Sequence, residues 1–283
     1  ALNRAGNWTQ FRQALRGYAV SGQNLVYADR HGVVGRVMAW ERIPAAGAAA
    51  LQLTVTPQEA GDWSERQGPL ELPAIRNPAT EMVVSANDVP VDLHPPGSLF
   101  GYPRDRLGRI AQRLLDAAPV SVEQAEAVQQ DVLQPSALEL AREITARVEA
   151  LGMKLPRTAR PVARAIAGWD GRYALNSAGA AALEQTAAHL VQLAYGERYG
   201  DKLAGYLQGA PAVYDLLAED VPDMKAVYVV QSLVKASDDN MQYKTWGEMH
   251  RLSLEHPLAN APVIGDWFRY GELAWPGGMN TVA

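Results

Sequence analysis

Near its N-terminus the chain reads Asn24-Leu-Val-Tyr-Ala-Asp-Arg-His-Gly-Val-Val-Gly35. Two extended runs rich in Val, Leu and Tyr, residues 24–28 and 33–40, flank a turn-forming cluster at 29–32. Gly32 stands where a tight turn often needs a positive φ angle, and the flanking residue types favour strands. The stretch therefore predicts a β-hairpin whose two strands belong to one sheet.

A short amphipathic helix is expected before the hairpin. Asn7 is suited to cap a helix over residues 8–19, and the Gln three positions later completes a capping box. After the hairpin, residues 41–80 contain repeated prolines and are expected to be irregular. Residues 81–86 then predict another short strand.

The pattern becomes helical over residues 104–235. Capping boxes beginning at Ser121 and at Ser136 predict two helix starts, and Gly152 is suited to end the helix that Ser136 opens. The helix that Ser121 opens is predicted over residues 122–133. Apolar periodicity predicts further helices over residues 109–117, 178–195, 212–219 and 223–236. Residues 245–283 return to loops and short strands.

These patterns place the chain in the α+β class with three consecutive parts. Residues 1–103 hold the first helix, the hairpin and the later strand of a sheet domain. Residues 104–240 form a large helical block, and residues 241–283 return to the sheet domain. We expect the block to be an insertion packed on one sheet domain, because no linker is polar enough to mark a domain boundary.

The composition excludes several classes of protein. The chain has 283 residues, of which 48% are hydrophobic, enough to bury a large core. A net charge of −5 provides no broad basic field, which disfavours nucleic acid and anionic membranes as partners. No apolar run of about 18 residues predicts a membrane span. The absence of cysteine excludes disulfides, thiolate chemistry and Cys-based zinc sites.

Most catalytic motifs are missing from the sequence, including the phosphate-binding loop, the dinucleotide fingerprint and the serine elbow. No histidines have the spacing of a helical zinc site. We expect His189 to be packed or hydrogen-bonded in a core, and His250 and His256 to be structural. The run Asp238-Asp239-Asn240 offers calcium-type oxygens, but it lacks spaced ligands and is better interpreted as a solvated turn.

A series of short segments occurs in a characteristic order along nearly the whole chain. They are Asn7-Trp8-Thr9-Gln10-Phe11, Gln23 to Asp29, Gly32 to Gly35, Asn77-Pro78, Ser85-Ala86-Asn87-Asp88, Arg106-x-x-Arg109-Ile110, Gln130-Asp131 with Ser136-Ala137, Trp169-Asp170-Gly171, Trp246-Gly247-Glu248-x-His250-Arg251 with His256-Pro257-Leu258, and Gly277-Gly278-x-Asn280-Thr281-Val282. In this order they resemble the β-subunit of the penicillin acylase (penicillin amidase) family of N-terminal nucleophile hydrolases.

The resemblance implies that the sheet elements belong to an αββα sandwich. In this family the nucleophile is the first residue of the β-subunit, usually Ser, and its own α-amino group serves as the base. That residue lies far upstream of the Asn-Trp helix, whereas this chain begins at Ala1, which has no nucleophilic atom. The interpretation is an interior part of the β-subunit of an autoproteolytically processed zymogen, with the nucleophile outside the 283 residues.

The resemblance also assigns two site residues. It places Asn87 at the oxyanion-hole asparagine, whose carboxamide N–H stabilises the negative oxygen that develops when an amide is attacked. It places Arg106 at the arginine that orients this asparagine and meets charged substrate groups. Taken without the family, Asn87 is a turn residue at a strand end, and Arg106 is a surface arginine.

The function implied is hydrolysis of N-acyl amides, such as penicillin-type β-lactam side chains or N-acyl homoserine lactones. The alternative is a non-catalytic scaffold fragment, or a homologue that has lost its nucleophile. The implied partners are the rest of the β-subunit and an α-subunit from the same precursor. The family implies that catalysis needs no cofactor. A structural calcium ion is compatible with the family, although its ligands cannot be identified in this sequence. The family also implies a protein that is periplasmic or secreted in bacteria.

Overall fold

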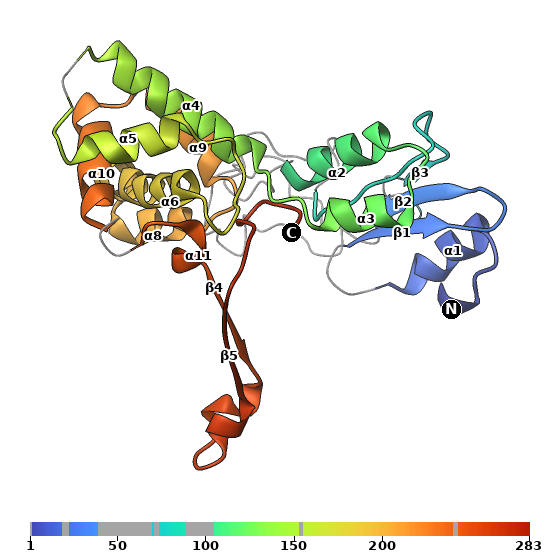
Figure 1. Cartoon of the computed structure of the whole chain (residues 1–283). Coiled ribbons are helices and arrows are strands. Elements are labelled where there is room, and N and C mark those ends of the chain that lie inside the picture. The colour runs from blue at the N-terminus through green and yellow to red at the C-terminus, as the bar shows by residue number, and fades with distance from the viewer. Residues whose placement is uncertain are drawn as a thin grey trace, which may run out of the picture. The chain divides into compact units, whose positions relative to one another are not determined.

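The computed structural model divides the chain into two compact units, residues 1–111 and 112–283. The residues it describes are 2–18, 23–38, 70, 74–88, 105–152, 155–239 and 243–283. Within them helices dominate, and the strands form two small sheets (Figure 1). The chain is therefore of the α+β class, as the sequence predicts.

The first unit contains a three-stranded antiparallel sheet in the order β1-β2-β3. Its elements are η1 (Leu2–Arg4), α1 (Trp8–Ala14), η2 (Leu15–Gly17), β1 (Asn24–Ala28), β2 (Val34–Met38), β3 (Ala74–Arg76) and the beginning of α2 (Asp105–Asp116). The predicted hairpin is confirmed by β1 and β2, which pair with Tyr27 opposite Gly35. The predicted residues 39 and 40 of its second strand lie outside the described residues.

The start of α1 follows the sequence prediction in part. The Asn7 side chain accepts a hydrogen bond from the Gln10 backbone N at 2.9 Å, which confirms Asn7 as the N-cap. The Gln10 side chain instead accepts from the Gly6 backbone N at 2.8 Å, one residue before the position that a capping box requires.

One face of the sheet packs against α1 through aromatic rings. Trp8 lies 5.5 Å from Tyr27 and 5.9 Å from Phe11 between ring centroids, and Leu15 and Val37 are fully buried beside them. Gly35 makes this contact possible. A Cβ there would lie 2.7 Å from Cη2 of Trp8 and 2.8 Å from the Ile75 backbone oxygen.

The hairpin turn is held by the carboxylate of Asp29. Its Oδ1 accepts from the backbone N of His31 at 2.8 Å and of Val33 at 3.1 Å, and its Oδ2 accepts from the Tyr27 hydroxyl at 2.8 Å. The bond from Tyr27 is the main cause that lowers the pKa of Asp29. Gly32 has a φ angle of +77°, as the turn prediction requires.

The predicted strand over residues 81–86 is wrong. The third strand of the sheet is β3, within the segment expected to be irregular, and its ladder with β2 ends at the pair of Gly35 and Arg76. Asn77 exchanges hydrogen bonds with the backbone of Val34 and adopts a φ angle of +45°, and Pro78 then turns the chain away. Residues 82–85 are not assigned to a strand and pair with none of the described strands, so propensity alone did not make them a strand.

The second unit is mainly helical and carries a two-stranded ribbon, after which a C-terminal segment follows (Figure 1). Its elements are α3 (Val122–Gln129), α4 (Pro135–Ala150), α5 (Ala159–Ala167), α6 (Ala178–Leu190), the π-helical η4 (Val191–Tyr195), α7 (Gly196–Tyr199), α8 (Asp201–Gln208), α9 (Val213–Asp220), η5 (Val221–Asp223), α10 (Ala226–Asp239), α11 (Trp246–Met249), β4 (Arg251–Glu255), η6 (Pro257–Asn260), η7 (Gly265–Phe268) and β5 (Arg269–Ala274).

The core of this unit lies where α5, α6 and α10 pack on one another and α4 packs on α9. The alanine-rich α6 is buried on almost every side, as expected of a helix that is apolar all round. The fully buried large side chains of the second unit include Leu140, Ile144, Ile166, Leu183, Leu190, Leu217 and Leu233. These residues give the unit a continuous apolar core.

Several helix predictions need correction. The capping box at Ser121 is confirmed, although its helix ends at Gln129. Ser136 does not cap α4: Pro135 takes the first helical position, which suits its fixed φ angle, and Ser136 is buried one residue inside. Gly152 follows the end of α4 with a φ angle of +56°, as predicted.

Other helix ends differ from the predicted ranges. The predicted helix 109–117 begins four residues earlier, at Asp105, and the predicted helix 223–236 runs as Ala226–Asp239. Helices α5 and α8 were not predicted. The sequence of α5 contains Pro161, which reads as a helix breaker but is tolerated in the first turn of a helix.

A buried polar network lies in the core of the second unit. The carboxylate of Glu184 on α6 accepts hydrogen bonds from the hydroxyls of Tyr173 and Tyr214, the latter at 2.8 Å. Burial raises the pKa of Glu184, and its two hydrogen bonds together with nearby His250 oppose that shift. Tyr173 is fully buried, so the network is shielded from water on that side.

The C-terminal segment closes over this network. Gly277 N donates to the Tyr173 backbone oxygen at 2.9 Å, and Trp246 Nε1 donates to the Gly277 oxygen at 2.9 Å. Asn280 donates from its backbone to Gln134 Oε1 at 3.3 Å and from its side chain to the Pro211 oxygen at 2.8 Å. These bonds fix the end of the chain onto the helices of its own unit.

We predict that Gly35→Ala lowers the stability of the protein by about 1–3 kcal/mol, because the added methyl overlaps the Trp8 indole. Thermal unfolding measures the effect. Gly108→Ala on α2 is the matched control, since its Cβ would meet no atom within 4 Å, and a gain of about 0.5–1 kcal/mol is expected there. Equal stability of Gly35→Ala and wild type would contradict the packing described for Trp8.

A second prediction concerns pH and Glu184. Its pKa in the folded chain lies above the ordinary value of 4.5, so its contribution to stability is complete below that pH and is lost as pH rises through the folded pKa. Glu184→Gln removes this titration. The unfolding temperature of the variant, minus that of wild type, is therefore expected to increase between pH 4 and 8, and parallel curves would contradict the raised pKa.

Candidate functional site

Asn87 follows the extended segment 82–85 in the first unit and is exposed. Its φ angle is +62°, in the left-handed region that asparagine tolerates better than most residues. The sequence predicts that Asn87 lies just past a strand, and this is wrong because residues 81–86 form no strand. Asn87 lies instead at a bend of the backbone, and its side chain is exposed.

Arg106 lies in the first turn of α2 and meets Asn87 directly. Its Nη2 donates to Asn87 Oδ1 at 2.7 Å and to the Ala86 backbone oxygen at 3.2 Å. A guanidinium carries only donors, so the contact directs the carboxamide oxygen of Asn87 toward the arginine. The N–H₂ group of Asn87 is then turned away from Arg106, where it can donate to another oxygen.

The loop around Asn87 is anchored to the hairpin by side chains. Arg36 on β2 forms an ion pair with Asp88, with Nη2 and Oδ2 2.8 Å apart, and its Nη1 donates to the Val84 oxygen at 2.9 Å. Asn24 on β1 donates from Nδ2 to the Asp88 oxygen at 2.6 Å. These contacts replace the backbone ladder that a strand would have supplied.

The structure thus brings together both residues that the sequence singled out. Their sequence separation of 19 gives no periodic signal for this contact. Sequence reasoning missed Arg36 and Asp88. The signal available was weak: one arginine in an otherwise apolar strand, and one aspartate directly after Asn87.

The histidines singled out by the sequence have structural contacts. His189 Nε2 lies 2.6 Å from Asp239 Oδ2, so Asp239 belongs to a hydrogen bond at the end of α10. His250 stacks on Trp246 with ring centroids 4.7 Å apart, and His256 Nδ1 accepts from the Leu258 backbone N. Among the described residues, no three His, Asp or Glu side chains are grouped so as to hold a metal ion.

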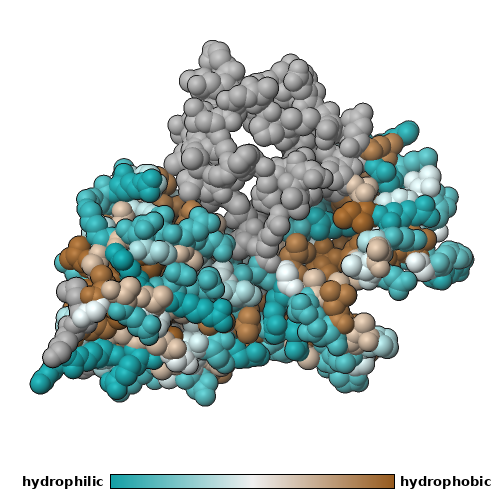
Figure 2. Space-filling view, turned by 90° about the horizontal axis from the view of Figure 1, so that it is seen from above, coloured by the Kyte–Doolittle hydropathy of each residue, from teal (hydrophilic) through white to brown (hydrophobic). Residues whose placement is uncertain are grey.

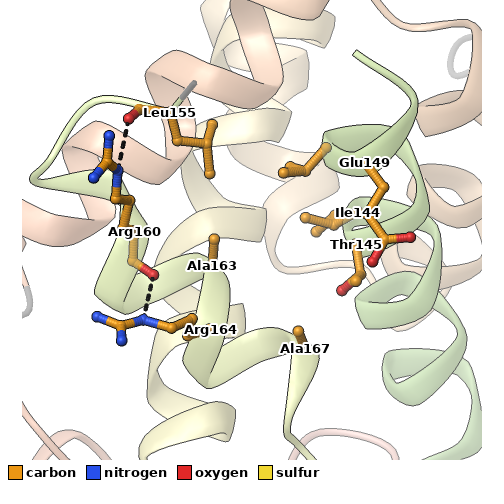
Figure 3. A pocket seen from close by; sticks show the side chains of 9 residues that line it. Ile144, Thr145, Glu149, Leu155, Arg160, Ala163, Arg164 and Ala167 are labelled. Atoms are coloured by element: carbon orange, nitrogen blue, oxygen red, sulfur yellow. Dashed lines mark hydrogen bonds between the residues drawn. The ribbon is translucent and has the colours of Figure 1, made fainter. Parts of the chain in front are cut away.

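A cavity of about 510 Å³ lies between α4 and α5 in the second unit (Figure 3). Ile144 and Thr145 face Ala163 and Ala167 across it, and Leu155 closes one end. The Thr145 hydroxyl donates to the Ala141 oxygen at 2.7 Å and is not free for chemistry. The lining is mostly apolar, and it also includes the charged side chains of Glu149, Arg160 and Arg164.

Within the described parts of the chain, no helix is both long enough and apolar enough to cross a membrane. The surface in view in Figure 2 has hydrophobic residues lying among hydrophilic ones. Among the described residues, Asn87 and Arg106 are the two site residues of the sequence analysis, and a hydrogen bond joins them.

The family model for penicillin amidase matches the whole chain, residues 1–283. The chain belongs to the penicillin amidase family. A relative in this family is the penicillin acylase 2 proenzyme of Pseudomonas sp. (strain SE83), which is 28% identical over 278 residues. The match covers 90% of this chain and 35% of the relative, so the chain spans about a third of that protein's length.

Many residues that carry the resemblance to the penicillin amidase family have structural contacts. Asp29 closes the hairpin turn, and Asn77 accepts a hydrogen bond from the Val34 backbone N just beyond the β2–β3 ladder. Trp246 and Gly277 join the C-terminal segment to the helices. The segment with Asn87 differs, because its exposed side chain is held in one orientation without being buried in a core.

Proposed function

We propose that the chain forms part of an amidohydrolase of the penicillin acylase type. Its substrates are N-acyl amines, such as penicillin-type β-lactams with their acyl side chain or N-acyl homoserine lactones. The nucleophile is an N-terminal serine in polypeptide outside the 283 residues. Membership in the penicillin amidase family supports this activity, as does the name of the proenzyme relative.

In the proposed reaction the serine oxygen bonds to the acyl carbon and the carbonyl oxygen becomes negative. The C–N bond then breaks, the amine leaves with a proton, and water hydrolyses the ester that remains. Asn87 supplies a neutral N–H donor for the negative oxygen, which stabilises it without exchanging a proton. The 2.7 Å hydrogen bond from Arg106 is the observation that carries this assignment, because it turns the carboxamide N–H₂ outward.

The proposal includes an assembly. The three-stranded sheet of the first unit belongs to a larger αββα sandwich completed by the rest of a β-subunit and by an α-subunit from the same precursor. The relative's description as a proenzyme supports a processed precursor. The setting is the bacterial periplasm or the exterior of the cell, and catalysis uses no cofactor. A structural calcium ion is compatible with this assembly, and we assign no ligands to it.

The experiment is expression of the complete gene and purification of the processed protein. Release of a chromogenic amine from N-phenylacetyl and N-acyl amides measures activity, and N-terminal sequencing identifies the residue at the processing junction. A Ser, Thr or Cys at that junction together with turnover supports an enzyme. Absence of such a residue would support a scaffold.

We predict that Asn87→Gly lowers kcat by about 10²–10³-fold with a modest change in KM, because the lost donor acts on the transition state. Glycine is preferred to alanine because it adopts the φ angle of +62° without strain. Asn77→Gly is the matched control, since Asn77 also has a positive φ angle and its described side-chain hydrogen bond is to Val34 of the hairpin. Retention of more than about a third of kcat in Asn87→Gly would show that Asn87 is only a turn residue.

Arg106→Ala is expected to lower kcat and raise KM, because the guanidinium is proposed both to orient Asn87 and to contact charged substrate groups. The double variant with Asn87→Gly tests the first role. If Arg106 acts through Asn87, the loss of kcat in the double variant is smaller than the product of the two single losses. Independent, multiplicative losses would assign Arg106 to substrate binding alone.

A further inference from the structure

Arg36 occupies an unusual place for a cation. It lies on β2, the central strand of the sheet, and its neighbours Gly35 and Val37 are buried on the face that packs against Trp8. Because side chains alternate along a strand, Arg36 points to the opposite face. Its side chain is only 13% exposed there, so the charge of the guanidinium is largely shielded from water.

The partner of Arg36 is buried more deeply. Asp88 is 6% exposed, and its Oδ2 lies 2.8 Å from Arg36 Nη2. Its Oδ1 accepts from the Ala86 backbone N at 3.1 Å, and its backbone oxygen accepts from Asn24 Nδ2. All these contacts fall on the two residues that flank Asn87, so the backbone on both sides of Asn87 is fixed.

A buried ion pair of this kind contributes little net stability, because the desolvation of both charges offsets their attraction. Its effect on geometry is more definite. The planar fork of Arg36 reaches the Val84 oxygen and the Asp88 carboxylate at once, which sets the distance between two points on the loop. Such a brace is useful where a side chain must be held accurately.

We propose that Arg36 and Asp88 are positioning residues for amide hydrolysis, acting as a brace that holds the Asn87 carboxamide where the oxyanion forms. This inference rests on the proposed function. Arg106 orients the amide group of Asn87, and the brace fixes the backbone from which that group projects. An oxyanion donor must be preorganised, and a displacement of about 1 Å costs about 10²-fold in rate.

The test uses the processed enzyme and the double variant Arg36→Met/Asp88→Asn, which removes both charges and leaves none buried alone. We expect kcat to fall by about 10–100-fold while KM changes little, since the ground state hardly uses the oxyanion donor. Arg36→Lys keeps the charge but loses the fork, and its kcat is expected to lie between wild type and the double variant.

The control is Arg113→Met, which breaks the pair between Arg113 and buried Asp131 in the second unit. It is expected to lower thermal stability without lowering kcat. If the double variant and Arg36→Lys fold and keep wild-type kcat, the brace is merely structural and the inference is overturned.

A mutant cycle with Asn87→Gly separates this inference from the proposed function. If the brace acts through Asn87, removing it in the Asn87→Gly background causes no further loss of kcat. A further loss of the same factor would overturn the inference and leave the role of Asn87 intact. Wild-type kcat in Asn87→Gly alone would instead overturn the oxyanion assignment, whatever the brace variants show.

Discussion

The contact between the Trp8 indole and Gly35 is the constraint on which the first unit depends. Only a residue without a side chain lets the ring lie against β2, and the ring in turn contacts Phe11 and Tyr27. Since strand residues alternate between faces, this contact fixes Arg36 on the opposite face. The position of the brace beneath Asn87 is therefore a consequence of apolar packing on the other side of the sheet.

The segment that carries Asn87 has no regular secondary structure, and side-chain contacts hold it in place. Residues 82–88 have no ladder of strand hydrogen bonds, yet Arg36, Asn24 and Arg106 bond to the backbone or side chains of this segment. A loop permits the left-handed angle at Asn87, which a regular strand would exclude. Charged and amide side chains then supply the order that the secondary structure does not.

The family resemblance carries mainly structural information. Asp29, Asn77 and Trp246 make turns and close contacts of the backbone, and none of them touches Asn87 in the described hydrogen bonds. Such residues identify the family because turns and close contacts accept few residue types.

The sequence by itself determined the features that depend on neighbours in the chain: the hairpin, the Asn7 cap, the Ser121 capping box and the glycine after α4. Only the tertiary structure decided that residues 81–86 are not a strand, since a strand exists only where a partner is available to bond it. The pairing of Arg36 with Asp88 joins residues 52 positions apart, and no local pattern encodes it. Long-range hydrogen bonds and ion pairs depend on which distant segments the fold brings together, so they cannot be predicted from any one segment.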